Sequence, residues 1–187
     1  MDKNRAWKRI TLSVGASALL VGTIAAPAFA ADTVTQAVTA GTRSASVADL
    51  TLASVAYSHS GQSSTGSMTL TADDSSGSGA GWNVTIISSA FVYSGSNGGT
   101  NIAASNFSLT SAATPVQTAG QAVDTTDGPY ASVTSGALNA ARKTVAANAG
   151  FGQGTYTQAL GVSLTIPAQS RVGTYTGTLT TTISAAP

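Results

Sequence analysis

The chain has 187 residues and contains no cysteine, no glutamate and one histidine. Four of the eight Lys and Arg residues and one of the seven Asp residues lie within the first 30 positions, so the rest of the chain carries 4 − 6 = −2 formal charges. That balance gives no reason to expect a nucleic-acid partner, and a charged fraction of 8% is too low for a charge-solvated disordered chain. The length favours one domain rather than two.

The first 30 residues are typical of a secretory signal peptide. A basic segment from Lys3 to Arg9 precedes an uncharged, largely apolar stretch over residues 10–26. Pro27 ends that stretch, and Ala28 and Ala30 place small residues at the −3 and −1 positions of a cleavage site. We therefore expect cleavage after Ala30 and a secreted product without a membrane segment. The alternative is an uncleaved membrane anchor, which the Ser, Thr and Gly residues of the stretch disfavour.

Beyond the signal, the pattern predicts an all-β protein. Residues 31–44 are polar and Thr-rich, which indicates a flexible N-terminal lead or an edge strand before a single domain over residues 45–187. Apolar residues then alternate with polar ones, as in half-buried strands. These runs are Leu50 and Leu52 with Val55 and Tyr57, then Met68–Ala72, Trp82–Ile86, Phe107–Leu109, Val162–Ile166 and Tyr175–Ile183.

Turn-forming clusters separate the runs at short intervals. They cover residues 73–81, 94–100, 124–129 and 150–154. Turns at such short intervals favour an antiparallel β-sandwich, Ig-like or related. The one stretch with helical spacing is 137–149, where Leu138, Ala141 and Val145 would share a face, so a short helix is expected there as an alternative to strand.

The sequence offers little catalytic chemistry. The single imidazole, His59, lies among Ser and Gly residues that predict a loop, and no GxSxG motif is present. Without Glu, a glycosidase-type carboxylate pair is hard to assemble, so we expect no enzyme activity and no catalytic residues. No cofactor or metal ligand set is expected, although the Asp-containing turns at Asp73–Ser75 and Asp124–Gly128 leave calcium as a possibility.

Two stretches of the sequence resemble the WxL-domain surface proteins of Gram-positive and related bacteria. Trp82-Asn83-Val84 is similar to the Trp-x-Leu motif of that family, with Val in place of Leu. The segment GTYTGTLTTTISAAP at the end of the chain is similar to the family's distal motif through Tyr175, Leu179 and Thr180, and Ile183 replaces its Leu. Thr181 stands at the distal Trp position, which is a departure from the family pattern.

The resemblance implies an exported, non-enzymatic domain that associates non-covalently with the cell wall, with peptidoglycan as the ligand and other surface proteins as further partners. Trp82 and Tyr175 are then the candidate ligand-binding residues. Alternation places Trp82 and Val84 on one inward face and Leu179, Thr181 and Ile183 on another, so these are also candidate core residues. For Trp82 the packing role is preferred to an exposed platform for sugar rings. Further candidates for exposed sugar contact are Tyr93, Tyr130 and Tyr156.

A second reading of the same sequence is a self-assembling extracellular fibre or coat subunit. Uncharged, Thr-rich strands with few lysines could pair through their edges, and residues 31–44 could serve as a donated strand. A secreted enzyme is the third and least favoured reading.

Overall fold

A computed structural model describes residues 33–132 and 135–186 of the chain. The chain divides into two units, 1–37 and 38–187, and the second contains all the described strands. The expected signal peptide and its cleavage site lie outside the described residues. The elements are β1 (Arg43–Val47), β2 (Gln62–Asp74), β3 (Trp82–Ser88), β4 (Val92–Ser94), a 3-10 turn (Ala104–Asn106), β5 (Phe107–Ala112), β6 (Val116–Gly120), β7 (Tyr130–Ala131), β8 (Gly136–Ala137), β9 (Arg142–Ala147), β10 (Gly154–Ile166), β11 (Thr174–Thr176) and β12 (Leu179–Ala185).

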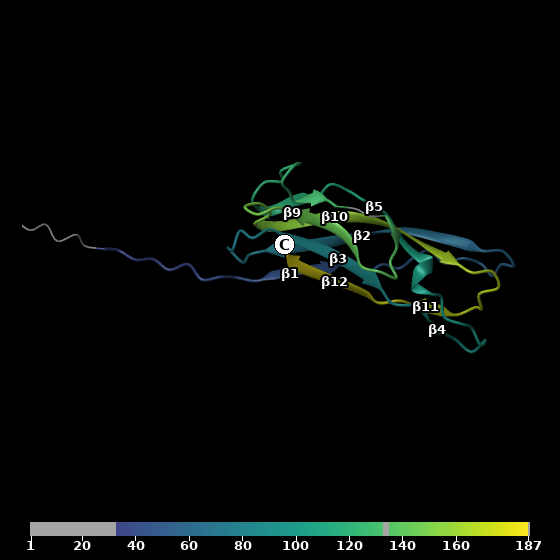
Figure 1. Cartoon of the computed structure of the whole chain (residues 1–187). Coiled ribbons are helices and arrows are strands. Elements are labelled where there is room, and N and C mark those ends of the chain that lie inside the picture. Colours follow the sequence, from purple (N-terminus) through teal and green to yellow (C-terminus); the bar gives the residue numbers. More distant parts are fainter. Residues whose placement is uncertain (1–32, 133–134, 187) are drawn as a thin grey trace, which may run out of the picture. The chain divides into compact units, whose positions relative to one another are not determined.

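The strands form two main antiparallel sheets and a small ribbon (Figure 1). The first sheet has the order β1-β2-β10-β5-β8, with β6 also pairing β10, and the second has the order β12-β3-β9-β7. The ribbon pairs β11 with β4. The expectation of an all-β, antiparallel sandwich is therefore confirmed.

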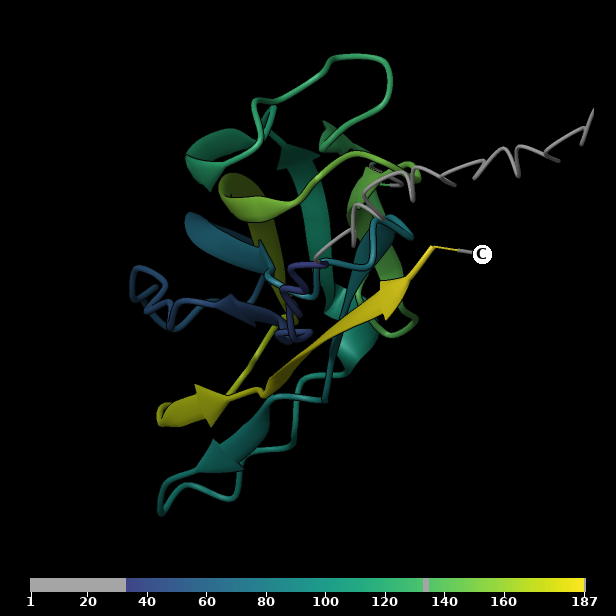
Figure 2. The ribbon, with the colours of Figure 1, turned by 90° about the vertical axis from the view of Figure 1, so that its left-hand side faces the viewer.

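The two main sheets face each other across one core (Figure 2). Alternation decides which residues enter it: β3 has the burial pattern of a strand with one inward face, and Trp82, Val84 and Ile86 are all 0% exposed. Tyr156 and Leu160 of β10 are buried in the same core from the other sheet. Since the chain has no cysteine, this apolar core supplies the stability that a disulfide would otherwise provide.

Residues 33–42, which precede β1, have no regular structure. Residues 33–42 are exposed throughout, and β1 begins at Arg43, so the last two positions of the predicted lead belong to the first strand. Within residues 33–132 and 135–186, no helix has the length and hydrophobicity needed to cross a membrane.

The helix expected at 137–149 is absent, and that expectation was wrong. The stretch contains the last residue of β8 and all of β9 instead, and β9 pairs β3 on one side and β7 on the other. Alanine-rich composition favours a helix locally, but two strand neighbours override that weak preference. Thr144 and Val145 are both buried because the sequence register of β9 shifts between Val84 and Thr85 of its partner.

The strands expected around Leu50–Leu52 and Val55–Tyr57 are also absent. Residues 48–58 run without strand structure, although Leu50 and Leu52 still pack against the core. The predicted run Tyr175–Ile183 is divided into β11 and β12, because β11 leaves to pair β4 while β12 pairs β3. The irregular segment 48–58 and the break between β11 and β12 lie at the same side of the sandwich.

Candidate functional site

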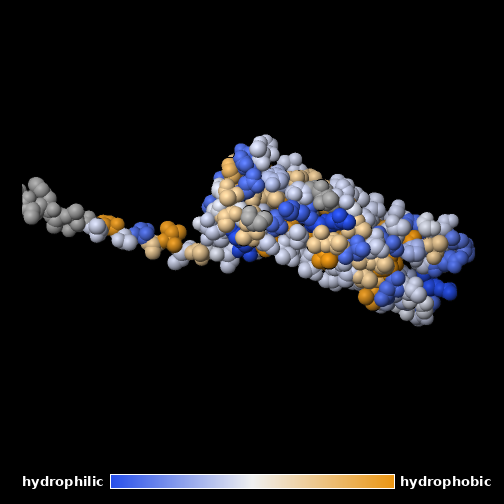
Figure 3. All heavy atoms as spheres, viewed as in Figure 1, coloured by the Kyte–Doolittle hydropathy of each residue, from blue (hydrophilic) through white to orange (hydrophobic). Residues whose placement is uncertain are grey.

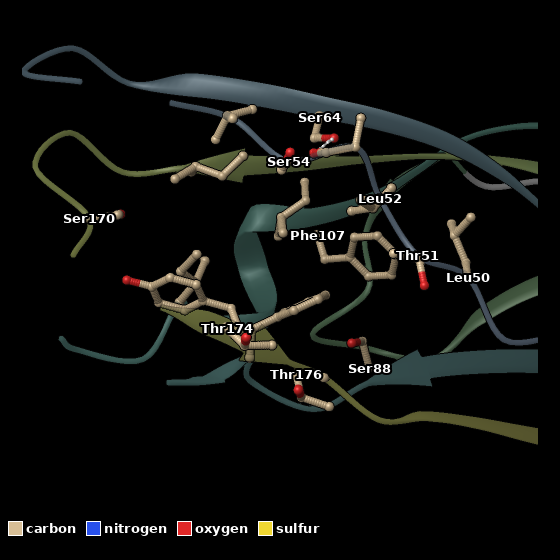
Figure 4. Close-up of a pocket in the computed structure, with 18 of the residues that line it drawn as sticks. Leu50, Thr51, Leu52, Ser54, Ser64, Ser88, Phe107, Ser170, Thr174 and Thr176 are labelled. Carbon is tan, nitrogen blue, oxygen red and sulfur yellow. Dashed lines mark hydrogen bonds between the residues drawn. The ribbon is translucent and has the colours of Figure 1, made fainter. Parts of the chain in front are cut away.

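A cleft of about 1200 Å³ opens at the side of the sandwich between β1 and β12 (Figure 4). One wall is formed by residues 45–58 and the other by residues 170–179 with Thr181. The remaining lining residues come from both sheets and from the loop after β3; they are Gln62, Ser64, Ser88, Phe91, Ile102, Phe107, Leu164, Ile166 and Pro167.

The first wall exists because β1 covers only part of β2. β2 has 13 residues, but β1 pairs only its last five, Leu70–Asp74. After a final backbone bond from the amide of Ala48 to the carbonyl of Thr69 (2.9 Å), the chain leaves the ladder. The hydroxyl of Ser64 donates to the carbonyl of Ala53 (3.0 Å), which holds the irregular segment beside β2 and lines the cleft with its side chains.

A glycine on β2 makes this arrangement possible. A Cβ on Gly66 would lie 2.9 Å from a methyl carbon of Leu52 and 3.0 Å from one of Leu50. The missing side chain at Gly66 is therefore the space that the two leucines occupy. Their burial against the strand compensates in part for the strand pairing that β2 lacks there.

The second wall follows from the break between β11 and β12. A Cβ on Gly177 would come within 3.0 Å of the Phe91 ring, so the glycine lets that ring approach the chain at the break. Phe91 in turn stacks edge-on against Phe107 with ring centroids 5.2 Å apart, which forms an apolar floor. At the far end the amide of Gln169 donates to the carbonyl of Ser58 (2.8 Å), so the two walls meet there.

The cleft is nearly free of charge. Among its lining residues only Asp49 and Arg171 carry a charge, and both are exposed. Its polar groups are mainly hydroxyls, with Thr51, Ser54, Thr174 and Thr176 exposed along the walls (Figure 4). Apolar floor and hydroxyl-bearing walls suit an uncharged ligand that has both apolar and hydrogen-bonding surface.

Aromatic side chains stand at the mouth of the cleft. Tyr175, a predicted ligand-binding residue, is half-buried in the wall, and its ring lies 5.3 Å from that of Tyr93. Its hydroxyl donates to the carbonyl of Arg171 (2.9 Å), which fixes the ring. On the opposite wall Tyr57 is 50% exposed and meets His59 edge-on at 5.3 Å. Aromatic ring faces are surfaces on which sugar rings pack, which makes Tyr57 and Tyr175 candidates for such contact.

Trp82, the other predicted ligand-binding residue, is not at the cleft. Its side chain is 0% exposed, its indole nitrogen donates to the carbonyl of Gly152 (2.8 Å), and its ring lies 6.2 Å from that of Tyr156. An enclosed indole with its donor satisfied contacts no ligand from solvent, which leaves the packing role. Tyr156 is also buried, at 1% exposed, so the expectation that it is an exposed sugar contact was wrong.

The two motif segments are neighbouring strands, although they lie about a hundred positions apart in the sequence. In the β3–β12 ladder, Thr181 lies opposite Ile86 and Ile183 lies opposite Val84. Val84 is fully buried, whereas Leu179 and Ile183 are half-buried and pack against the core from the edge strand. Leu179 and Thr181 line the cleft, so the distal motif borders the site while the first motif supports it from within.

The Asp-containing turns have internal partners. The Asp74 carboxylate lies 3.1 Å from Arg43 and accepts a hydrogen bond from the Ser76 hydroxyl. Asp124 accepts hydrogen bonds from the backbone amides of Asp127 and Thr126, which lower the pKa of its carboxyl group. Among the described residues, no group of three or more His, Cys, Asp or Glu side chains could hold a metal ion.

Comparison with known families adds the deciding observation. The family model described as WxL domain surface cell wall-binding matches residues 25–187. The chain belongs to the WxL family. No curated protein and no solved structure matches it. As a WxL protein it is a surface protein associated with the cell wall, and the resemblance found in its sequence is confirmed.

Part of the cleft lining belongs to the distal motif of the WxL family. The distal motif reaches the cleft through Tyr175, Leu179 and Thr181, whereas the rest of the lining carries no sequence signal that marked it in advance. Thr51, Thr174 and Phe107 enter the site only because two irregular connections diverge at one side of the sandwich. A periodicity analysis treats those connections as strands or turns and so misses the space between them.

Proposed function

We propose that this WxL protein attaches non-covalently to the cell wall by binding the glycan strands of peptidoglycan in the cleft between β1 and β12. The observation that supports the proposal is the chemistry of the lining: hydroxyls and aromatic rings around an apolar floor, with only Asp49 and Arg171 charged. The family is described as cell wall-binding, and the lining of this cleft supports our choice of it as the binding site.

A glycan strand fits this lining better than the other components of a wall. Sugar rings carry apolar faces that pack on Tyr or Phe rings, and their hydroxyl and acetamido groups pair with Thr and Ser hydroxyls. Stem peptides and phosphate polymers carry ionised groups, which favour Arg and Lys clusters. A single exposed cation, Arg171, is a poor match for such ionised components.

The proposed role is binding without catalysis. Hydrolysis of a glycosidic bond normally uses two carboxyl groups that flank the scissile bond. Asp49 is the only carboxylate among the residues that line the cleft, and His59 is not among them. The export that this role requires is supported by the signal-like first 30 residues.

Co-sedimentation of residues 31–187 with purified peptidoglycan tests the proposal. Thr176 is exposed on the wall of the cleft, so Thr176→Glu should preserve the fold while it places a charge where a neutral ligand binds. We expect at least tenfold weaker binding. Thr180→Glu is the matched control, since Thr180 is exposed on β12 but is absent from the cleft lining. Equal binding by both variants, or no binding by the unmodified chain, would contradict the proposal.

A further inference from the structure

Residues 33–40, which precede β1, have the composition of a strand but no strand partner within the described part of the chain. We call residues 33–40, TVTQAVTA, the donor segment. It has no charged residue, and Thr and Val predominate. Val34 is 99% exposed and Val38 is 93% exposed, and both would lie on one face if the segment were extended. Hydrophobic spheres are visible along this extended segment in Figure 3.

The cleft offers an unpaired strand edge. Among the described strands, β12 is the terminal strand of its sheet and pairs only β3; β1 of the other sheet lies near it without pairing it. The carbonyl of Thr178 and the amide of Ala186 both bond toward the β3 side of this strand. Because successive residues direct their backbone groups to opposite edges, those of Leu179 and Thr181 point to the other edge, which is the cleft. β11 continues that edge, since β4 is its only partner among the residues that the structure describes.

We propose that the donor segment of one copy docks as an extra β-strand in the cleft of a second copy, along the edge formed by β11 and β12. Backbone hydrogen bonds to the free edge would give affinity, and Val34 and Val38 would reach the apolar floor at Phe107. Eight extended residues span about 26 Å at ~3.3 Å each, and the wall they would follow runs over nine residues, 173–181. Both surfaces are nearly uncharged, so no unpaired charge is buried.

The geometry favours a second copy over the chain's own cleft. The carbonyl of Thr42 accepts a hydrogen bond from the amide of Ser75 (3.0 Å), which fixes the start of β1 beside the end of β2. The cleft begins at Ala45, within β1, and extends beyond Val47, away from Thr42. To enter its own cleft, the donor segment would have to reverse direction and run back past the length of β1. A neighbouring molecule requires no reversal.

Docking of this kind is head-to-tail, because the donor and the acceptor are different surfaces of the same chain. Such an interface forms rings if the rotation closes and open chains if it does not. The donor segment would also occupy the cleft that we assign to the glycan. Association of copies and binding to glycan should therefore exclude each other, a consequence that rests on the proposed function, whereas the docking itself does not.

Light scattering on residues 31–187, in the absence of peptidoglycan, tests the docking. We expect a mass that rises with protein concentration. Val34→Asp with Val38→Asp should raise the concentration needed for association at least tenfold, and the exposure of both side chains makes loss of folding unexpected. Thr35→Asp with Thr39→Asp is the charge-matched control, because these residues alternate with the valines and would face away from the floor. The control should associate as the unmodified chain does.

A peptide of residues 33–40 provides the second measurement. It should bind a chain that begins at Gly41, and a scrambled peptide of the same composition should not. Thr181→Trp in that chain should weaken peptide binding at least fivefold, because the larger side chain fills the acceptor cleft. A monomeric unmodified chain at all concentrations, equal association of the two double variants, or peptide binding that ignores Thr181→Trp would each overturn the proposal. Failure of glycan binding alone would leave these results unchanged.

Discussion

The indole nitrogen of Trp82 donates a hydrogen bond to the backbone carbonyl of Gly152, 2.8 Å away, across the core. This bond joins the first strand of the family motif to the loop before β10. Trp82→Ala should lower the free energy of unfolding by about 3–5 kcal/mol, because it leaves a large cavity. Trp82→Phe keeps most of the volume but leaves the buried carbonyl unpartnered, at a cost of at least ~1–3 kcal/mol. Urea denaturation measures both, with the outward-facing Thr85→Ala as the control.

Gly152 is placed so that no side chain fits. Its φ is +76°, and a Cβ would lie 2.5 Å from the Ala147 methyl group and 2.8 Å from the Trp82 nitrogen. We expect Gly152→Ala to be destabilising through both backbone strain and overpacking. Gly150 separates the two effects, since its φ is +85° but nothing lies within 4 Å of its would-be Cβ. Gly152→Ala should therefore cost about 1–3 kcal/mol more than Gly150→Ala in thermal or chemical unfolding. Equal losses would mean that overpacking contributes nothing.

Period-two alternation predicted the strands whose one face lies in the core. Trp82–Ile86 and Val162–Ile166 satisfy it because one sheet face is buried and the other is polar. The rule failed for β9, where Thr144 and Ala146 are buried as well as Val145 and Ala147, so the strand has no polar face to alternate. Without alternation, the spacing of Leu138, Ala141 and Val145 indicated a helix instead.

The cleft could not be predicted because it depends on where strands end. Leu50 and Leu52 alternate like a strand, yet they lie on an irregular segment that takes the space above Gly66. Whether a chain continues a ladder after Val47 or leaves it is decided by contacts with residues distant in sequence, such as Ser64 with Ala53. Tyr175 was identified as a site residue only through the family resemblance.

The buried ion pair of Arg43 and Asp74 should make stability depend on pH. Burial alone would raise the pKa of Asp74, but the Ser76 hydroxyl and amide together with Arg43 outweigh it and hold the pKa below its ordinary value of 3.8. Because the folded pKa lies below the unfolded one, the stabilisation is complete above about pH 4 and is lost as the pH falls through the folded value. Unfolding free energies measured from pH 6 down to pH 2 should decline accordingly.

Asp74→Asn isolates that contribution. At neutral pH it leaves Arg43 without its partner, which should cost about 3 kcal/mol, at the lower end for a buried pair because Arg43 is 17% exposed. The variant should then lose less stability than the unmodified chain between pH 5 and pH 2. Arg43→Gln should also reduce the loss of unfolding free energy between pH 5 and pH 2. If the unfolding free energy fell equally with pH in all three chains, the ion pair would not control the pH dependence.

Wall binding through the cleft should depend weakly on salt. Screening acts on charges, and the cleft has only Asp49 and Arg171 among its lining residues. Hydrogen bonds and aromatic contacts are not screened in this way. We expect the dissociation constant for peptidoglycan to change less than threefold between 0.05 and 0.5 M NaCl. Over this range the electrostatic screening length falls from roughly 14 Å to roughly 4 Å. Elution of all bound protein by the higher salt concentration would point to an ionic ligand instead.

Thr181 stands where the family motif has Trp, and its position decides what restoring the Trp would do. A fully enclosed Thr would leave no room, and the larger ring would overpack the core at a cost of ~1–3 kcal/mol. Thr181 is instead half-buried on the edge strand and lines the cleft. A Trp there can extend over the apolar floor beside Phe107 and Leu52, where buried apolar area contributes roughly 25 cal/mol per Å². Thr181→Trp should therefore melt at or above the temperature of the unmodified chain.

The same variant should alter binding in a direction that separates the two occupants of the cleft. An added indole face increases contact with sugar rings, so binding to peptidoglycan should strengthen. The donor segment needs the space that the indole fills, so association of copies should weaken. Thr180→Trp places the same side chain on the opposite face of β12, away from the cleft, and should change neither property. Thermal melts measure the stability of these two variants, co-sedimentation measures their binding to peptidoglycan, and light scattering measures their association. A lower melting temperature for Thr181→Trp would show that position 181 is closed to a larger side chain.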